Sequence, residues 1–146
     1  MIQLNGKSRI YLVVGDPIEQ VKSPAGMTES FQKNGLNALV IPAHVAPSVF
    51  KTFIETVALA KNFDGILVTV PHKLAAHDLC RQLSERAAFL KAVNVIRRAP
   101  DGSWYGEMCD GAGFYKAARK NGGDVRVVKP WWLVPVELDQ QSPILC

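Results

Sequence analysis

The chain alternates short runs of β-branched, apolar residues with longer segments in which apolar residues recur every three or four positions. Three of the apolar runs cover residues 9–15, 38–45 and 66–70, and Gly, Pro or Asp residues bound them. Short apolar runs between turn residues are typical of buried strands, whereas the intervening spacing is typical of helices. Strands that alternate with helices form a mainly parallel sheet that is covered on both faces. The sequence therefore predicts an α/β fold, a three-layer sandwich with a mostly parallel sheet.

The helices between these strands are predicted from apolar spacing and from residues that start or stop a helix. They are expected over residues 25–35, 47–61, from 71 onward, 84–92 and 111–123. Two further strands, 93–97 and 104–107, flank the turn Ala-Pro-Asp-Gly and should form a hairpin. Pro42 lies inside the second strand and has no N–H for a ladder, which predicts that this strand lies at an edge of the sheet.

Length and charge exclude several classes of function. With 146 residues and a net charge of +4, the chain suits one domain and is only mildly basic, and its Lys and Arg residues are scattered. No apolar stretch approaches the roughly 20 residues that cross a bilayer, and the N-terminus lacks the apolar region of a signal peptide. The three cysteines form no CxxC pair, so no metal site is expected. We therefore expect a cytoplasmic protein without nucleic-acid or membrane partners.

Polar side chains lie next to the ends of the predicted strands. Thr69 and Lys73 come at the end of the third strand, and Asn94 and Asp110 lie at the two outer ends of the hairpin. Ligands of parallel sheets bind at the carboxyl ends of the strands. Lys73 and Asp110 are a candidate proton-transfer pair, because burial lowers the pKa of an amine and a neighbouring carboxylate favours its charged form. The alternative is that Lys73 is a solvated first-turn residue, Asp110 a helix cap and Asn94 a turn residue.

Four segments together resemble the motifs of the shikimate dehydrogenase family. The family pattern reads PI-x-H-S-x-S-P, N-V-T-x-P-x-K, A-V-N-T and G-x-N-T-D-G-x-G-F. The corresponding segments here read PIEQVKSP, LVTVPHK, AVNV and GEMCDGAGF, in the same order within residues 9–121. Four motifs in order are far more specific than any one of them. The resemblance implies a substrate-binding domain over residues 1–124, followed by an irregular tail over residues 125–146.

The resemblance also implies a chemistry. It predicts an oxidoreductase that uses NADP or NAD to oxidise, reversibly, a ring hydroxyl of shikimate, quinate or a related acid. The family's catalytic Lys and Asp fall on Lys73 and Asp110. Its Thr and Asn ligands of the substrate hydroxyls fall on Thr69 and Asn94, and the second Ser of its carboxylate-binding pair falls on Ser23.

Several positions depart from the family pattern, and each departure removes a polar group. Val21 replaces the first carboxylate-binding Ser, and Leu67 replaces the Asn that opens the second motif. Val95 and Met108–Cys109 replace further polar residues. Losing a hydrogen-bond donor to a substrate group costs about 1 to 3 kcal/mol. Lys22, beside the lost Ser, is a candidate to bind the carboxylate as a point charge. The pattern therefore indicates a divergent shikimate- or quinate-dehydrogenase-like member with an altered substrate pocket.

The family binds its cofactor in a second domain, and the sequence motif of that domain is not expected in this chain. The dinucleotide fingerprint G-x-G-x-x-G does not occur, so no NADP or NAD is expected to bind this chain. One hypothesis is that the reading frame was lost near residues 125–130, because a shifted frame of residues 131–143 can encode Val-Ala-Gly-Ala-Gly-Gly-Val-Gly-Ser-Ala-Ile-Ala. The truncated chain would then bind substrate weakly and not turn it over.

Two alternatives to an oxidoreductase stay open at this point. One is a non-catalytic module that binds a small polyol acid with the same pocket. The other is an interaction domain that self-associates as a homodimer through the apolar tail around Trp131–Trp132.

Overall fold

The computed structural model of the chain describes residues 4–121, apart from the side chain of Ala118. The chain divides into two compact units, Met1–Met108 and Cys109–Cys146, and each is treated separately below. The predicted tail over residues 125–146, with the Trp131–Trp132 pair and the frameshift hypothesis, lies outside the described residues.

A six-stranded sheet forms the centre of the first unit, with the strand order β2-β1-β3-β5-β6-β4. The strands are β1 (Arg9–Gly15), β2 (Ala38–His44), β3 (Phe63–Val68), β4 (Gln82–Leu83), β5 (Val95–Arg98) and β6 (Trp104–Glu107). Strand β1 pairs in parallel with β2 and β3, and β4 pairs in parallel with β6. Strand β5 runs antiparallel to β3 and β6, as the predicted hairpin requires. The prediction of a mostly parallel sheet is confirmed.

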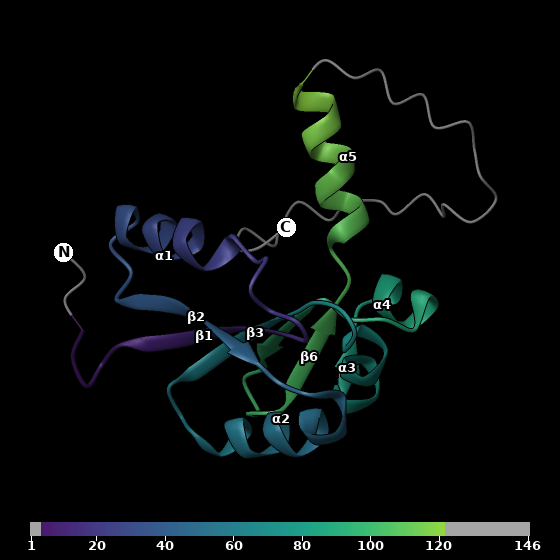
Figure 1. The fold of residues 1–146 in the computed structure, drawn as a ribbon, viewed down its shortest axis with the longest axis horizontal. Helices are drawn as coiled ribbons and strands as arrows, with labels where there is room; N and C mark the ends of the chain where they lie inside the picture. Colours follow the sequence, from purple (N-terminus) through teal and green to yellow (C-terminus); the bar gives the residue numbers. More distant parts are fainter. Residues whose placement is uncertain (1–3, 122–146) are drawn as a thin grey trace. The chain divides into compact units, whose positions relative to one another are not determined.

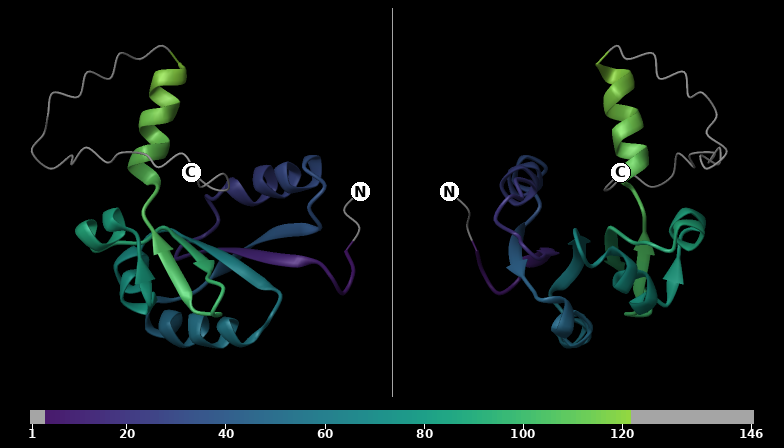
Figure 2. Two further views of the ribbon diagram at one scale, coloured as in Figure 1. Left: turned by 180° about the vertical axis from the view of Figure 1, so that it is seen from behind. Right: turned by 45° about the vertical axis from the view of Figure 1, so that its right-hand side comes forward.

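Helices lie on both faces of this sheet, with α1 on one face and α2 on the other (Figures 1 and 2). The helical segments of the first unit are α1 (Ser23–Lys33), the short 3-10 helix Pro47–Val49, α2 (Phe50–Leu59), α3 (Lys73–Leu79) and α4 (Glu85–Leu90). The second unit contributes α5 (Asp110–Lys120). One apolar cluster, which includes Phe31 and Val40, packs under α1, and a larger one, which includes Phe50 and Ile54, packs under α2. The three-layer arrangement is thus confirmed.

The structure differs from the predicted elements mainly around β3 and β4. Strand β3 covers residues 63–68 rather than 66–70, because the chain turns at Thr69 towards α3. Strand β4 was not predicted, and its two residues pair with Tyr105 and Gly106 of β6. A pairing of two residues has no periodicity to detect, and tertiary contact with β6 alone defines it.

Strand β2 lies at the edge of the sheet, as Pro42 predicts. Its Val40 N–H donates to the side-chain Oγ1 of Thr28 at 2.9 Å, and its Ala38 N–H donates to the Leu36 carbonyl at 2.9 Å. Pro42 has no N–H to offer. Exposed edge strands promote aggregation by pairing with other chains, so these features protect the edge of the sheet.

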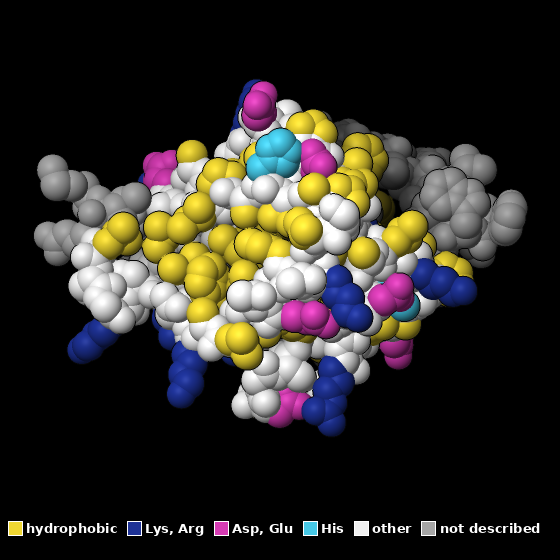
Figure 3. All heavy atoms as spheres, turned by 60° about the horizontal axis from the view of Figure 1, so that its bottom comes forward, with side chains coloured by type: hydrophobic (Ala, Val, Ile, Leu, Met, Phe, Trp, Pro, Cys, Tyr) yellow, Lys and Arg dark blue, Asp and Glu magenta, His cyan; other side chains and the backbone are white. Residues whose placement is uncertain are grey.

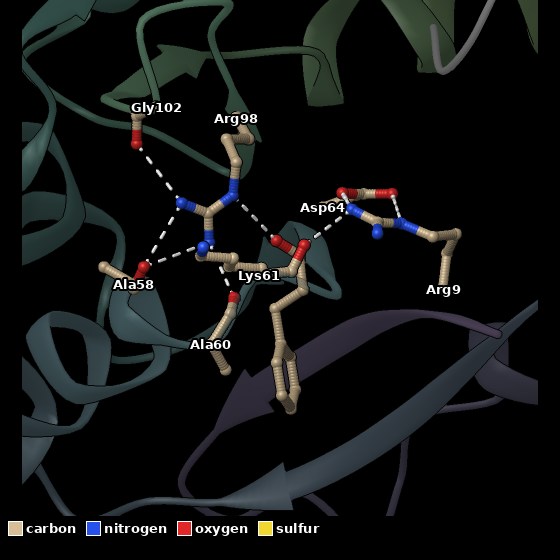
Figure 4. Close-up of polar contacts among 8 residues, drawn as sticks. Arg9, Ala58, Ala60, Lys61, Asp64, Arg98 and Gly102 are labelled. Carbon is tan, nitrogen blue, oxygen red and sulfur yellow. Dashed lines mark hydrogen bonds and ion pairs between the residues drawn. The ribbon is translucent and has the colours of Figure 1, made fainter. Parts of the chain in front are cut away.

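A single half-buried guanidinium, that of Arg98, connects the ends of several elements at the amino end of β3 (Figure 4). It donates at 3.0–3.3 Å to the backbone carbonyls of Ala58, Ala60, Phe63 and Gly102. It also lies over the Trp104 ring, 4.5 Å from the centroid. Next to this group, Arg9 pairs with Asp64 and donates to the Lys61 carbonyl at 2.8 Å. Arg98 therefore satisfies the last carbonyls of α2, which no helical N–H can reach.

Replacing Arg98 with Ala should destabilise the first unit by about 1 to 3 kcal/mol, because partly buried carbonyls lose their donor and the end of α2 loses a cation. Urea denaturation followed by circular dichroism measures this free energy of unfolding. Arg97→Ala is the matched control, since Arg97 is exposed and its guanidinium lies 4.1 Å from the Tyr105 ring centroid. The control should lose no more than about 1 kcal/mol. Equal losses in the two variants would contradict this role of Arg98.

Candidate functional site

The loops after β1 and β3 are held side by side at the carboxyl edge of the sheet by backbone hydrogen bonds. The Thr69 N–H donates to the Val14 carbonyl at 2.9 Å, and the Asp16 N–H donates to the Val70 carbonyl at 3.0 Å. The end of β2 joins them, because the Val45 N–H donates to the Gly15 carbonyl at 3.1 Å. These bonds bring the first motif next to the second one, although more than 50 residues separate Asp16 from Val70 in the sequence.

Gly15 allows this close approach because it has no side chain. A Cβ atom at Gly15 would lie 2.4 Å from Thr69 Cγ2 and 3.2 Å from both Ile18 Cδ1 and the Val70 carbonyl oxygen. A separation of 2.4 Å is far inside the ordinary contact distance between carbon atoms. Any larger residue at position 15 would displace Thr69 from its place.

Lys73 and Asn94 are anchored to the same edge through their backbones. Lys73 is the first residue of α3, and its carbonyl accepts from the Val93 N–H at 2.9 Å. The Asn94 carbonyl accepts from Val68 at 2.8 Å, and its N–H donates to the Glu107 carbonyl at 2.9 Å. The side chains of Thr69, Lys73 and Asn94 are all half-buried. Three of the predicted site residues therefore share the carboxyl edge of β3 and the segment that leads into β5.

The predicted carboxylate-binding residues lie at the start of α1. Ser23 is the first residue of α1 and Lys22 precedes it, and both are exposed. Val21, which replaces the family's first Ser, is half-buried and packs against the apolar cluster under α1. Leu67, which replaces the family's Asn, packs against that same cluster. Two of the departures from the family pattern thus extend one apolar cluster.

Asp110 belongs to the second unit. It is the first residue of α5 and is exposed, and Cys109 takes the preceding cap position. A carboxylate in the first turn is favourable because the N-terminal end of a helix carries partial positive charge. In the first unit, Arg86 Nη1 donates to the Met108 carbonyl at 3.0 Å and so holds the last residue of that unit. The pairing of Asp110 with Lys73 stays a prediction.

Sequence reasoning missed two histidines at the carboxyl edge. His44 ends β2, and its Nε2 lies 2.7 Å from Asp16 Oδ1 at the end of β1. His72 is buried directly before Lys73. For His44 the signal was available, since it lies at the end of a predicted strand, as Thr69 does. For His72 the sequence held no signal of burial.

Other chemistries find little support among the residues that the structure describes. Within residues 4–121, no group of three or more His, Cys, Asp or Glu side chains could hold a metal ion. None of the helices in this range is long and apolar enough to cross a membrane. Burial raises the pKa of the Cys80 thiol to about 12, so Cys80 is a poor nucleophile near neutral pH. On the face shown in Figure 3, acidic and basic side chains are interspersed around an apolar area, without a continuous basic stripe.

Gly15→Ala should move Thr69 and destabilise the first unit by about 1 to 3 kcal/mol, because the new methyl group overpacks the carboxyl edge. Thermal unfolding measures the stability, and amide NMR shifts of Thr69 and Val70 measure the displacement. Gly26→Ala is the control, since Gly26 lies in α1 and a Cβ there has nothing within 4 Å. That substitution should stabilise the protein slightly, since Ala favours a helix. Unchanged shifts at Thr69 in the Gly15 variant would refute the close-approach argument.

Known proteins resemble this chain in sequence and in structure. A family model for the shikimate dehydrogenase substrate binding domain matches residues 13–96. A shikimate dehydrogenase (NADP(+)) of Microcystis aeruginosa is 35% identical over 130 residues, which are 89% of this chain and 45% of that protein. The crystal structure of the Aquifex aeolicus shikimate dehydrogenase has a TM-score of 0.76 and 29% identity, over 81% of this chain and 44% of that one.

A second solved structure contains bound shikimate. The shikimate 5-dehydrogenase of Listeria monocytogenes, in complex with shikimate and NAD, has a TM-score of 0.78 and 27% identity, over 84% of this chain and 42% of that one. The present chain spans less than half of the length of these relatives. Because the family model covers more than half of the chain, the chain belongs to the shikimate dehydrogenase substrate-binding domain family.

Proposed function

We propose that the chain is the substrate-binding part of a shikimate-dehydrogenase-like oxidoreductase that acts on shikimate, quinate or a related acid. The observation that supports this proposal best is the common anchoring of Thr69, Lys73 and Asn94. Backbone hydrogen bonds of 2.8–3.0 Å hold each of these residues at the carboxyl edge of the sheet. These are the positions to which the resemblance assigns the ligands of the reacting hydroxyl and its neighbours.

Each residue has a role in this proposal. Lys73 takes the proton from the substrate hydroxyl during oxidation and returns it during reduction, and Asp110 orients Lys73 and that hydroxyl. Thr69 and Asn94 hydrogen-bond the neighbouring hydroxyls. Ser23 donates to the substrate carboxylate, and Lys22 attracts it as a point charge. With Val21 in place of a hydroxyl side chain, the carboxylate loses one donor.

The turns that follow β1 and β3 do not fit a dinucleotide. Its phosphates bind to a Gly-rich turn between a strand and a helix. Here the turn from β1 to α1 holds Asp16, Pro17 and Glu19, and the turn from β3 to α3 holds Pro71, and neither turn is Gly-rich. In whole enzymes of this type, NADP or NAD carries the hydride on a second domain. The isolated chain is therefore expected to bind its substrate without turning it over.

A non-catalytic module that binds a small polyol acid is the second candidate function, and the same anchored residues favour it. Both candidate functions predict that the isolated chain binds the acid weakly and does not turn it over. They separate when the coding sequence is followed beyond residue 146, since only the enzyme requires a dinucleotide domain. Self-association through the tail depends on residues outside the described range.

Titration of the protein with shikimate and quinate tests the proposed site. We expect dissociation constants in the millimolar range, about −4 kcal/mol, with amide shifts concentrated at Ser23, Thr69, Lys73 and Asn94. NADP should cause no comparable shifts, and no NADPH should form when shikimate and NADP are mixed with the chain. Shifts confined to other parts of the sheet would remove the assignment of the site.

Val21→Ser should restore a donor beside Ser23 and tighten shikimate binding about tenfold, which corresponds to about 1.4 kcal/mol. Val21→Ala is the control, because it also removes apolar contact with the cluster under α1 but adds no donor. Isothermal titration gives the affinities, and urea denaturation shows what each variant loses in stability. If the Ser and Ala variants bind shikimate equally, the carboxylate does not lie near position 21.

A further inference from the structure

His72 is a buried titratable side chain that the proposed mechanism does not use. It is 2% exposed and immediately precedes Lys73. Its ring stacks on Phe50, with centroids 4.3 Å apart and planes 5° from parallel, and its Nε2 lies 2.7 Å from the Val45 carbonyl oxygen. Because a carbonyl only accepts hydrogen bonds, Nε2 must carry the hydrogen.

This ring connects the start of α3 to the other strands of the carboxyl edge. Val45 itself donates to the Gly15 carbonyl at 3.1 Å, so the contact continues from His72 to the end of β1. The His72 N–H donates to the Thr69 carbonyl at 3.0 Å, and the His72 carbonyl accepts from Ala76 at 2.8 Å within the first turn of α3. The backbone around Lys73 is thereby tied to β3, to α3 and, through the imidazole, to β2.

We propose that His72 is a positioning residue. Its imidazole N–H donates to the Val45 carbonyl, holds the first turn of α3 in place and so determines the position of the Lys73 amine. The role assigned to Lys73 rests on the proposed function, whereas the contacts of the His72 ring do not. Apolar packing alone does not account for a histidine here, because burying its polar nitrogens costs free energy that a phenylalanine would avoid. The hydrogen bond to Val45 is what distinguishes the two side chains.

Two substitutions separate the ring from the hydrogen bond. His72→Phe keeps a ring on Phe50 but removes the donor to Val45. His72→Gln loses the ring but places an amide N–H at nearly the same reach as Nε2. His77→Phe is the control, since His77 lies on α3, the helix that His72 precedes, and its Nδ1 contacts Asp78 at 2.8 Å.

The measurement uses the whole chain with isotope-labelled lysine, and Lys73→Arg assigns the side-chain NMR signal of Lys73. In His72→Phe that signal should shift, and the dissociation constant for shikimate should rise about tenfold. His72→Gln should return both values towards those of the wild type, and His77→Phe should change neither. Urea denaturation of each variant records the separate effect on stability.

Several outcomes would overturn the positioning role. If His72→Phe is less stable but keeps the wild-type Lys73 signal and shikimate affinity, the ring serves packing alone. If His72→Gln behaves as His72→Phe does, the hydrogen bond is not the cause. If His72→Phe fails to fold, His72→Gln is compared with His72→Asn, whose amide is one bond shorter, and equal Lys73 signals in these two variants refute the role.

The same experiment separates this inference from the proposed function. The Lys73 signal is measured first without any ligand. If the wild-type chain does not bind shikimate, but the signal moves in His72→Phe and returns in His72→Gln, the proposed substrate is wrong and the positioning role stands.

Discussion

Two backbone hydrogen bonds at the carboxyl ends of β1 and β3 determine what this edge of the sheet can do. Thr69 donates to Val14 and Asp16 donates to Val70, so the segments that follow β1 and β3 continue to pair where the strands end. This pairing requires a residue without a side chain at Gly15, since Thr69 Cγ2 occupies the space where a Cβ would lie. The second motif, with Thr69 and Lys73, takes its position from this contact.

The two ends of the proposed substrate site rest on different supports. Thr69, Lys73 and Asn94 take their positions from backbone bonds of β3, α3 and the segment before β5, whereas Val21 and Leu67 pack in the apolar cluster under α1. Substitutions in that cluster can therefore change the proposed carboxylate end without moving the residues that are proposed to bind the substrate hydroxyls. The family residues are kept at Thr69, Lys73 and Asn94 and altered at Val21 and Leu67, which agrees with the proposal of an altered substrate pocket.

Local signals in the sequence predicted the parts of the fold that depend on local chemistry. Pro42 predicted the edge strand, and Ser84 predicted the start of α4, where its side chain accepts from the Ala87 N–H at 3.2 Å. Strand β4 and the burial of His72 could not be predicted. Their causes lie far away in the sequence, in the pairing with β6 and in the carbonyl of Val45, which is 27 residues from His72. The candidate site residues were identified from ordered sequence motifs, which do not say how far apart these residues lie in space. The motifs could therefore identify Lys73, but not the hydrogen bond from His72 to Val45 beside it.

The arginine side-chain contacts and the proposed ligand site lie at opposite ends of β3. At the amino end of β3, the side chains of Arg98 and Arg9 donate hydrogen bonds to backbone carbonyls. Without these side chains, the carbonyls would lose their donors. At the carboxyl end, backbone atoms make most of the contacts that hold the edge together, and His72 adds a side-chain contact. Backbone bonds survive when a side chain is replaced. The fold can therefore tolerate changes in the side chains of the proposed site, which is the property a family needs if its members are to diverge in substrate.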